Sequence, residues 1–149
     1  FQGPMFQHLQ SYRELTATNC IADIRCEKQQ LFGRYFPQAI FTGNPAVRDA
    51  FLHAIQPCVP QSFILPLSID RIRFFRPLDE LASVQMMARE MERTENEYRY
   101  EVNVFAPDGQ VVEVLAEELY KGKWRGRTRH GKVVELMTAG TVRVPPLRL

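Results

Sequence analysis

The stretch NPAVRDAFLHAIQP, residues 44–57, decides how the rest of the chain is interpreted. Asn44 is a favoured helix N-cap, and Pro45 suits the first helical position because its fixed φ matches a helix and an N–H is not needed there. Pro57 cannot continue a helix without the loss of a hydrogen bond. These signals predict a helix of about twelve residues between the two prolines.

The predicted helix has one polar and one apolar face. At about 100° per residue, Asp49, His53 and Gln56 fall within about 60° of one another. The opposite side is apolar and consists of Ala46, Val47, Ala50, Phe51, Ala54 and Ile55. A carboxylate, an imidazole and a carboxamide in one stripe are typical of the wall of an acid–base pocket.

We therefore predict Asp49 and His53 as candidate catalytic residues and Gln56 as a candidate substrate-binding residue. A simpler interpretation exists for each of them. Asp49 and His53 could be an exposed i,i+4 pair that only stabilises the helix. Gln56 could donate hydrogen bonds to backbone near the helix end instead of contacting a substrate.

Alternating apolar and polar residues on both sides of the helix predict β-strands. The predicted strands cover residues 18–27, 63–65, 69–75, 81–93, 98–105 and 110–120, with a break at Pro66 and an irregular strand at 133–144. Asp108-Gly109 predicts a hairpin turn. A sheet that wraps around one central helix would bury the apolar stripe of the helix and the inner face of the sheet together. The pattern therefore predicts an α+β protein with the hotdog fold.

The composition is that of one soluble domain, with 149 residues, 45% apolar and 24% charged. No apolar run approaches the roughly 20 residues that cross a bilayer, and there is no signal-like leader, so we expect a cytoplasmic protein without membrane contact. Cys20, Cys26 and Cys58 fit neither a disulfide framework nor a zinc motif. We expect them to be reduced, mostly buried thiols.

The net charge of +2 conceals an asymmetry along the chain. Residues 1–120 carry 11 basic and 16 acidic residues, whereas residues 121–149 carry 8 basic residues and one acid. The basic segment 121–132 contains Trp124 but no nucleic-acid-binding motif, so we expect an acidic protein partner and no nucleic acid. A solvated tail is the alternative. We divide the chain into a hotdog domain, residues 5–120, and a basic C-terminal extension, residues 121–149.

Residues 44–53 (NPAVRDAFLH) resemble the HPxxxDAxxQ/H element of polyketide synthase dehydratase domains. Residues 65–74 (LPLSIDRIRF), 3–9 (GPMFQHL) and 104–112 (VFAPDGQVV) resemble the LPxSIDxxRF, GPxFQxL and VxDxDGxVV segments of the same domains. In that family all four belong to the second, C-terminal hotdog of a double hotdog. The detail around residues 49–60 is most similar to iterative bacterial synthases of the enediyne type. If the resemblance holds at Gly3-Pro4, these two residues are native. Otherwise residues 1–4 (FQGP) are the remnant of a common protease-recognition linker.

The resemblance implies a dehydratase half-domain that removes water from a 3-hydroxyacyl chain on the phosphopantetheine arm of an acyl carrier protein. The product would be a 2-enoyl thioester. In the family a histidine of the first hotdog is the base, and the helix aspartate assists departure of the hydroxyl. That role falls on Asp49, and His53 would orient Asp49 or contact the hydroxyl. We expect no cofactor bound by the chain itself.

The family's base lies in an HxxxGxxxxP motif that this chain lacks, because no glycine stands four residues after His8, His53 or His130. A second hotdog, from the same polypeptide or in a homodimer, would therefore supply the base. Two other functions stay open: a non-catalytic hotdog that binds the acyl chain or organises the assembly line, and a hotdog thioesterase. The basic segment would contact the carrier protein, so charge reversal at Arg125 and Arg127 should weaken carrier binding in a salt-dependent way.

Overall fold

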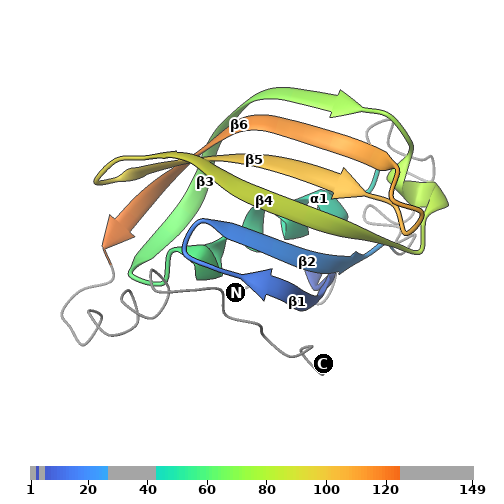
Figure 1. Ribbon diagram of the computed structural model, residues 1–149, viewed down its shortest axis with the longest axis horizontal. Helices are drawn as coiled ribbons and strands as arrows, with labels where there is room; N and C mark the ends of the chain where they lie inside the picture. The colour runs from blue at the N-terminus through green and yellow to red at the C-terminus, as the bar shows by residue number, and fades with distance from the viewer. Residues whose placement is uncertain (1–2, 4–5, 27–42, 125–149) are drawn as a thin grey trace.

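The structure is a computed structural model that describes Gly3, residues 6–26 and residues 43–124, with side chains in the last strand described up to residue 115. The described part contains one antiparallel sheet in the order β1-β2-β4-β5-β6-β3, with helix α1 behind it (Figure 1). This is the predicted α+β hotdog. The predicted strand at 133–144 and most of the basic segment lie outside the described residues.

The strands and helices agree with most of the sequence-based boundaries. The strands are β1 (Leu9–Leu15), β2 (Asn19–Arg25), β3 (Ser62–Phe74), β4 (Ser83–Arg93), β5 (Glu97–Phe105) and β6 (Val111–Trp124), and the helices are α1 (Pro45–His53) and the short 3₁₀ helices η3 (Gln56–Cys58) and η4 (Leu78–Glu80). The β5–β6 hairpin turns at Gly109, whose φ of 84° favours glycine. None of the helices among these residues is long and apolar enough to cross a membrane.

Helix α1 begins as predicted but ends one turn early. The Asn44 side chain accepts a hydrogen bond of 2.9 Å from the Ala46 N–H, which caps the first turn. The last α-helical residue is His53. Pro57 has no N–H to donate to the carbonyl of His53, so the chain tightens into η3, where the Cys58 N–H donates to the Ile55 carbonyl at 2.9 Å.

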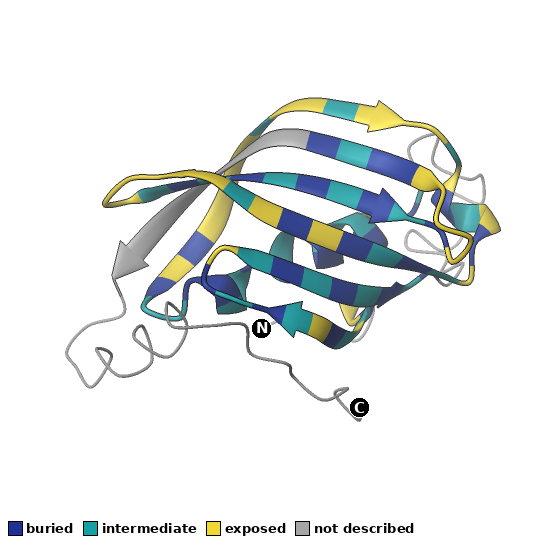
Figure 2. Ribbon diagram, in the orientation of Figure 1, coloured by how far each residue is buried: buried dark blue, intermediate teal, exposed yellow. Residues whose placement is uncertain are grey.

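The hydrophobic core lies between the apolar face of α1 and the concave face of the sheet. All six apolar residues predicted for that helix face are buried. β2, β4 and β5 alternate between buried and partly exposed positions along most of their length (Figure 2). Cys20, Cys26 and Cys58 are free and buried in this layer, as predicted. Complete burial of a side chain such as that of Phe51 contributes about 1.5–3 kcal/mol.

Two strands differ from the sequence-based boundaries. β1 was not predicted, because register shifts between Leu9 and Ser11 and between Tyr12 and Glu14 break its alternation. β3 is one continuous strand and not two short ones separated at Pro66. It forms an edge of the described sheet, and the register shifts just after Pro66. A proline is tolerated at an edge and at a bulge because its missing N–H is not needed there.

Candidate active site on helix α1

Asp49 and His53 lie together on the face of α1 opposite its apolar stripe, as predicted. The His53 Nε2 atom is 3.3 Å from the Asp49 Oδ1 atom. The exposed fractions of the two side chains are 29% for Asp49 and 33% for His53. The apolar stripe is buried in the core, so Asp49 and His53 lie on the side of the helix that faces away from it and stay partly accessible.

Gln56 lies beyond α1, in η3, and its carboxamide is occupied by backbone groups. Its Nε2 atom donates to the Ser62 carbonyl at 2.9 Å and to the Val59 carbonyl at 3.3 Å. Its Oε1 atom accepts from the Ile64 N–H at 3.0 Å. Gln56 thus ties η3 to the start of β3. Its role as a substrate contact stays a prediction, and such a contact would have to replace one of these backbone hydrogen bonds.

A buried ion pair that the sequence pattern did not reveal lies next to Asp49. The Arg48 Nε atom is 2.7 Å from Glu113 Oε1, and the Arg48 Nη2 atom is 3.0 Å from Glu113 Oε2. The Glu113 side chain is only 1% exposed. In the run VVEVL a strict alternation would place the glutamate opposite its valine neighbours, but Val112 and Glu113 are both buried. A register shift between Val104 and Phe105 in the β5–β6 pairing accounts for this loss of alternation.

A second polar cluster lies near the C-terminal end of α1 and the start of β5. The Tyr100 hydroxyl donates to Glu90 Oε2 at 3.0 Å, and the Arg93 Nη2 atom lies 2.6 Å from the same oxygen. The Tyr12 hydroxyl donates to the Ala54 carbonyl at 2.9 Å. Burial, above all, raises the pKa values of Tyr12 and Tyr100 well above their ordinary range. Both phenols therefore keep their protons at neutral pH and serve as hydrogen-bond donors in the core.

Cys58 is not suited to act as a nucleophile. A hydrogen bond with Cys20 and burial raise the pKa of the Cys58 thiol far above its ordinary value. A thiolate is the reactive form of cysteine, so this environment suppresses its reactivity. Among the described residues, no group of three or more His, Cys, Asp or Glu side chains is placed to hold a metal ion. The accessible Asp49–His53 pair is thus the best candidate for acid–base chemistry in the described part of the chain.

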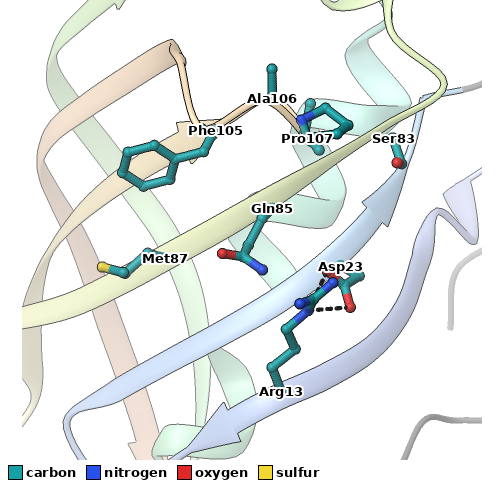
Figure 3. A pocket seen from close by; sticks show the side chains of 10 residues that line it. Arg13, Asp23, Ser83, Gln85, Met87, Phe105, Ala106 and Pro107 are labelled. Carbon is teal, nitrogen blue, oxygen red and sulfur yellow. Dashed lines mark hydrogen bonds and ion pairs between the residues drawn. The ribbon is translucent and has the colours of Figure 1, made fainter.

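A cavity of about 480 Å³ lies on the sheet (Figure 3). Its lining includes Asp23, Gln85, Met87 and Phe105, which alternate with the buried residues of β2, β4 and β5 and so belong to the outer face of the sheet. Arg13 also lines the cavity, and its Nε atom lies 2.9 Å from the Asp23 carboxylate. Neither Asp49 nor His53 lines this cavity.

Several solved structures share this fold. The dehydratase domain from the CurJ module of curacin polyketide synthase has 12% identity and a TM-score of 0.64, over 82% of this chain and 44% of that one. A trans-acyltransferase polyketide synthase enoyl-isomerase has 17% identity and a TM-score of 0.63, over 80% and 46%. A thioesterase from Haemophilus influenzae has 14% identity and a TM-score of 0.53, over 76% and 77%. The chain thus spans less than half of the two polyketide synthase structures, and these likenesses show the fold alone.

Sequence comparison is more specific than structural likeness. No curated protein sequence matches the chain significantly. The profile described as "Polyketide synthase dehydratase N-terminal domain" matches residues 1–117, which is most of the chain. This match shows that the chain belongs to the polyketide synthase dehydratase domain family.

Proposed function

We propose that the chain is one hotdog of a polyketide synthase dehydratase that acts on a 3-hydroxyacyl chain carried by an acyl carrier protein. The observation that carries the proposal is the accessible Asp49–His53 pair on α1 in a chain of this family. Elimination of water needs a base for the α-proton and an acid for the departing β-hydroxyl. Asp49 assists departure of the hydroxyl, and His53, 3.3 Å away, orients the carboxyl group or contacts the hydroxyl.

The base comes from a second hotdog. Asp49 and His53 occupy one face of one helix, so His53 is poorly placed to reach the opposite side of a substrate held by Asp49. His8 is buried, and its Nδ1 atom lies 2.8 Å from the Arg25 carbonyl oxygen. This chain lacks the HxxxGxxxxP motif, and four of its segments resemble the C-terminal hotdog. Both features support the assignment of the chain to the C-terminal half of the double hotdog. The family profile that matches is named for the N-terminal domain. The native sequence before Phe1 tests this assignment: an HxxxGxxxxP motif there would support it, and the lack of one would oppose it.

The second hotdog binds at the β3 edge of the sheet. Five of the exposed large apolar side chains lie on β3 or directly after it, with exposed fractions of 43–60%: Phe63, Leu65, Leu67, Phe74 and Phe75. A row of apolar side chains on an edge strand favours the addition of another strand. The guanidinium of Arg48, the residue before Asp49, lies 5.1 Å from the centre of the Phe74 ring. A hotdog bound at this edge would therefore lie close to Asp49.

Two other functions are tested by the same measurement. The likeness to a thioesterase favours a hotdog in which the helix carboxylate would activate water against the thioester. The absence of the base motif favours a non-catalytic hotdog that holds the acyl chain. The three candidates differ in product: a 2-enoyl thioester, a free acid, or unchanged substrate.

The experiment compares wild type with Asp49→Asn in the full-length protein that contains both hotdogs, on a 3-hydroxyacyl thioester substrate. We expect wild type to form the 2-enoyl thioester and the variant to lose about 10²–10⁴-fold in kcat, because an amide cannot act as a general acid or base. Glu92→Gln is the control, since Glu92 is an exposed carboxylate on β4 with 63% of its side chain accessible. Full activity of Asp49→Asn would remove Asp49 from the mechanism, and release of free acid would identify a thioesterase.

A further inference from the structure

Arg48 joins three elements of the fold through one side chain. Its two contacts with Glu113, at 2.7 and 3.0 Å, form the parallel fork that a guanidinium and a carboxylate prefer. Its side chain is 14% exposed and that of Glu113 is 1% exposed. Burial of two charges is costly and is tolerated only where the geometry is good. The pair is therefore held in one defined arrangement.

The third contact reaches the edge strand. The Arg48 guanidinium lies 5.1 Å from the centre of the Phe74 ring, within the range of a cation–π interaction. Phe74 of β3 and Glu113 of β6 are partners in the register of the two strands. Arg48 thus binds α1 to a cross-strand pair that consists of one carboxylate and one aromatic ring.

Most of the side chains that α1 buries are small. The buried residues of α1 are Ala46, Val47, Ala50 and Phe51, so Phe51 is the one bulky side chain among them. Small side chains leave shallow grooves, so a contact besides that of Phe51 is needed to define the rotation about the helix axis closely. A rotation of only about 20° would move a side-chain atom some 6 Å from the axis by about 2 Å. Arg48 immediately precedes Asp49, so both would move together.

We propose that Arg48 and Glu113 are a positioning pair, which fixes the rotation of α1 and thereby holds the Asp49 carboxylate in place relative to the β3 edge. The catalytic consequence rests on the proposed function of Asp49. The positional consequence does not, because it concerns the orientation of α1 within the chain. The two consequences are measured separately.

The first measurement is the kinetics of Arg48→Lys in the full-length protein. Lysine keeps the charge that neutralises buried Glu113 but loses the planar fork, so it separates geometry from charge. We expect kcat to fall about 10–100-fold with KM nearly unchanged, since a displacement of about 1 Å can cost 10²-fold in rate. Arg89→Lys is the matched control, because the Arg89–Glu101 pair is 3.4 Å long and largely exposed. The control should keep the wild-type kcat.

The second measurement is the NMR signals of the Asp49 carboxyl carbon and the His53 ring in the same variants. We expect both signals to shift in Arg48→Lys and to stay in place in Arg89→Lys. Glu113→Asp keeps the charge but shortens the side chain, so we expect it to act like Arg48→Lys. It takes the place of Arg48→Lys if the lysine variant does not fold. Unchanged signals and unchanged kcat in folded variants would overturn the inference. Shifted signals together with full activity of Asp49→Asn would keep the positioning pair and reject the proposed function.

Discussion

The strands β2 and β3 are both rich in apolar residues, but their surroundings differ. In β2 every second residue is buried, and the strand lies between β1 and β4. In β3 the apolar residues after Ile64 are mostly exposed, and the strand forms an edge of the described sheet. Figure 2 shows the contrast as an alternating β2 and a largely exposed β3. Alternation in a sequence therefore predicts a strand, but it does not reveal whether this chain or another one covers it.

The outer face of the sheet meets solvent in a different way from the β3 edge. Near β2 and β4 it carries the ion pairs Arg13–Asp23 and Arg89–Glu101. The first part of β3 instead exposes Phe63, Leu65 and Leu67 with Pro66 among them. Charged pairs suit a surface that stays in water, whereas contiguous apolar side chains mark a surface that becomes covered. The difference agrees with the proposed binding of a second hotdog at the β3 edge.

The largest expected effect is on stability and compares two phenylalanines. Phe51 is fully buried between α1 and the sheet, whereas Phe63 on β3 is 43% exposed. We expect Phe51→Ala to lower the free energy of unfolding by about 3–5 kcal/mol, because it removes buried contacts and leaves a cavity. We expect Phe63→Ala in the unassociated protein to cost less than about 1 kcal/mol. Urea unfolding measures both, and equal losses would mean that β3 is as well packed as the core.

The next effect is on association and compares β3 with the outer face. We expect Leu65→Asp to weaken binding of the second hotdog at least about 100-fold, or about 2.7 kcal/mol, because a charge would have to enter an apolar interface. Met87→Asp is the control, since Met87 lies in the outer-face cavity and is 38% exposed (Figure 3). Sedimentation equilibrium of the separately expressed halves gives both affinities. Loss of binding in Met87→Asp alone would place the interface on the outer face.

The sequence predicted those features that depend on local signals. Asn44 and Pro45 correctly marked the start of α1, and the aspartate–histidine spacing correctly placed Asp49 beside His53. The hairpin at Asp108-Gly109 and the buried faces of β2, β4 and β5 also followed from local patterns. Each of these signals acts within a few residues, so tertiary contacts did not need to be known.

The features that were missed depend on pairing between distant segments. Bulges removed the alternation of β1, and the edge position of β3 allowed Pro66 to lie within a continuous strand. Glu113 became a buried residue because the register of β5 against β6 shifts near the hairpin. Its partner Arg48 is 65 residues away in the chain. A pattern within one strand carries no information about such a partner.

The smallest of these effects is a loss of stability at alkaline pH, which comes from the buried thiol of Cys26. Burial, with a smaller contribution from the Asp79 charge, raises the pKa of the Cys26 thiol to about 12. In the unfolded chain the same thiol has a pKa of about 8.5, so above that pH the unfolded state loses a proton that the folded state keeps. Its stabilising contribution is therefore complete below about pH 8.5 and is lost progressively as the pH rises toward 12.

At pH 9.5 this one thiol should lower the free energy of unfolding by roughly 1 kcal/mol relative to pH 7.5. Urea unfolding at the two pH values measures the loss, and Cys26→Ala should make the loss smaller by that amount. Leu65→Asp on the exposed β3 edge is the control, because it leaves the buried thiols unchanged and should keep the wild-type pH dependence. An equal loss in wild type and Cys26→Ala would show that Cys26 ionises as readily in the folded protein as in the unfolded chain. The surroundings of Cys26 would then be more accessible to solvent than its burial indicates.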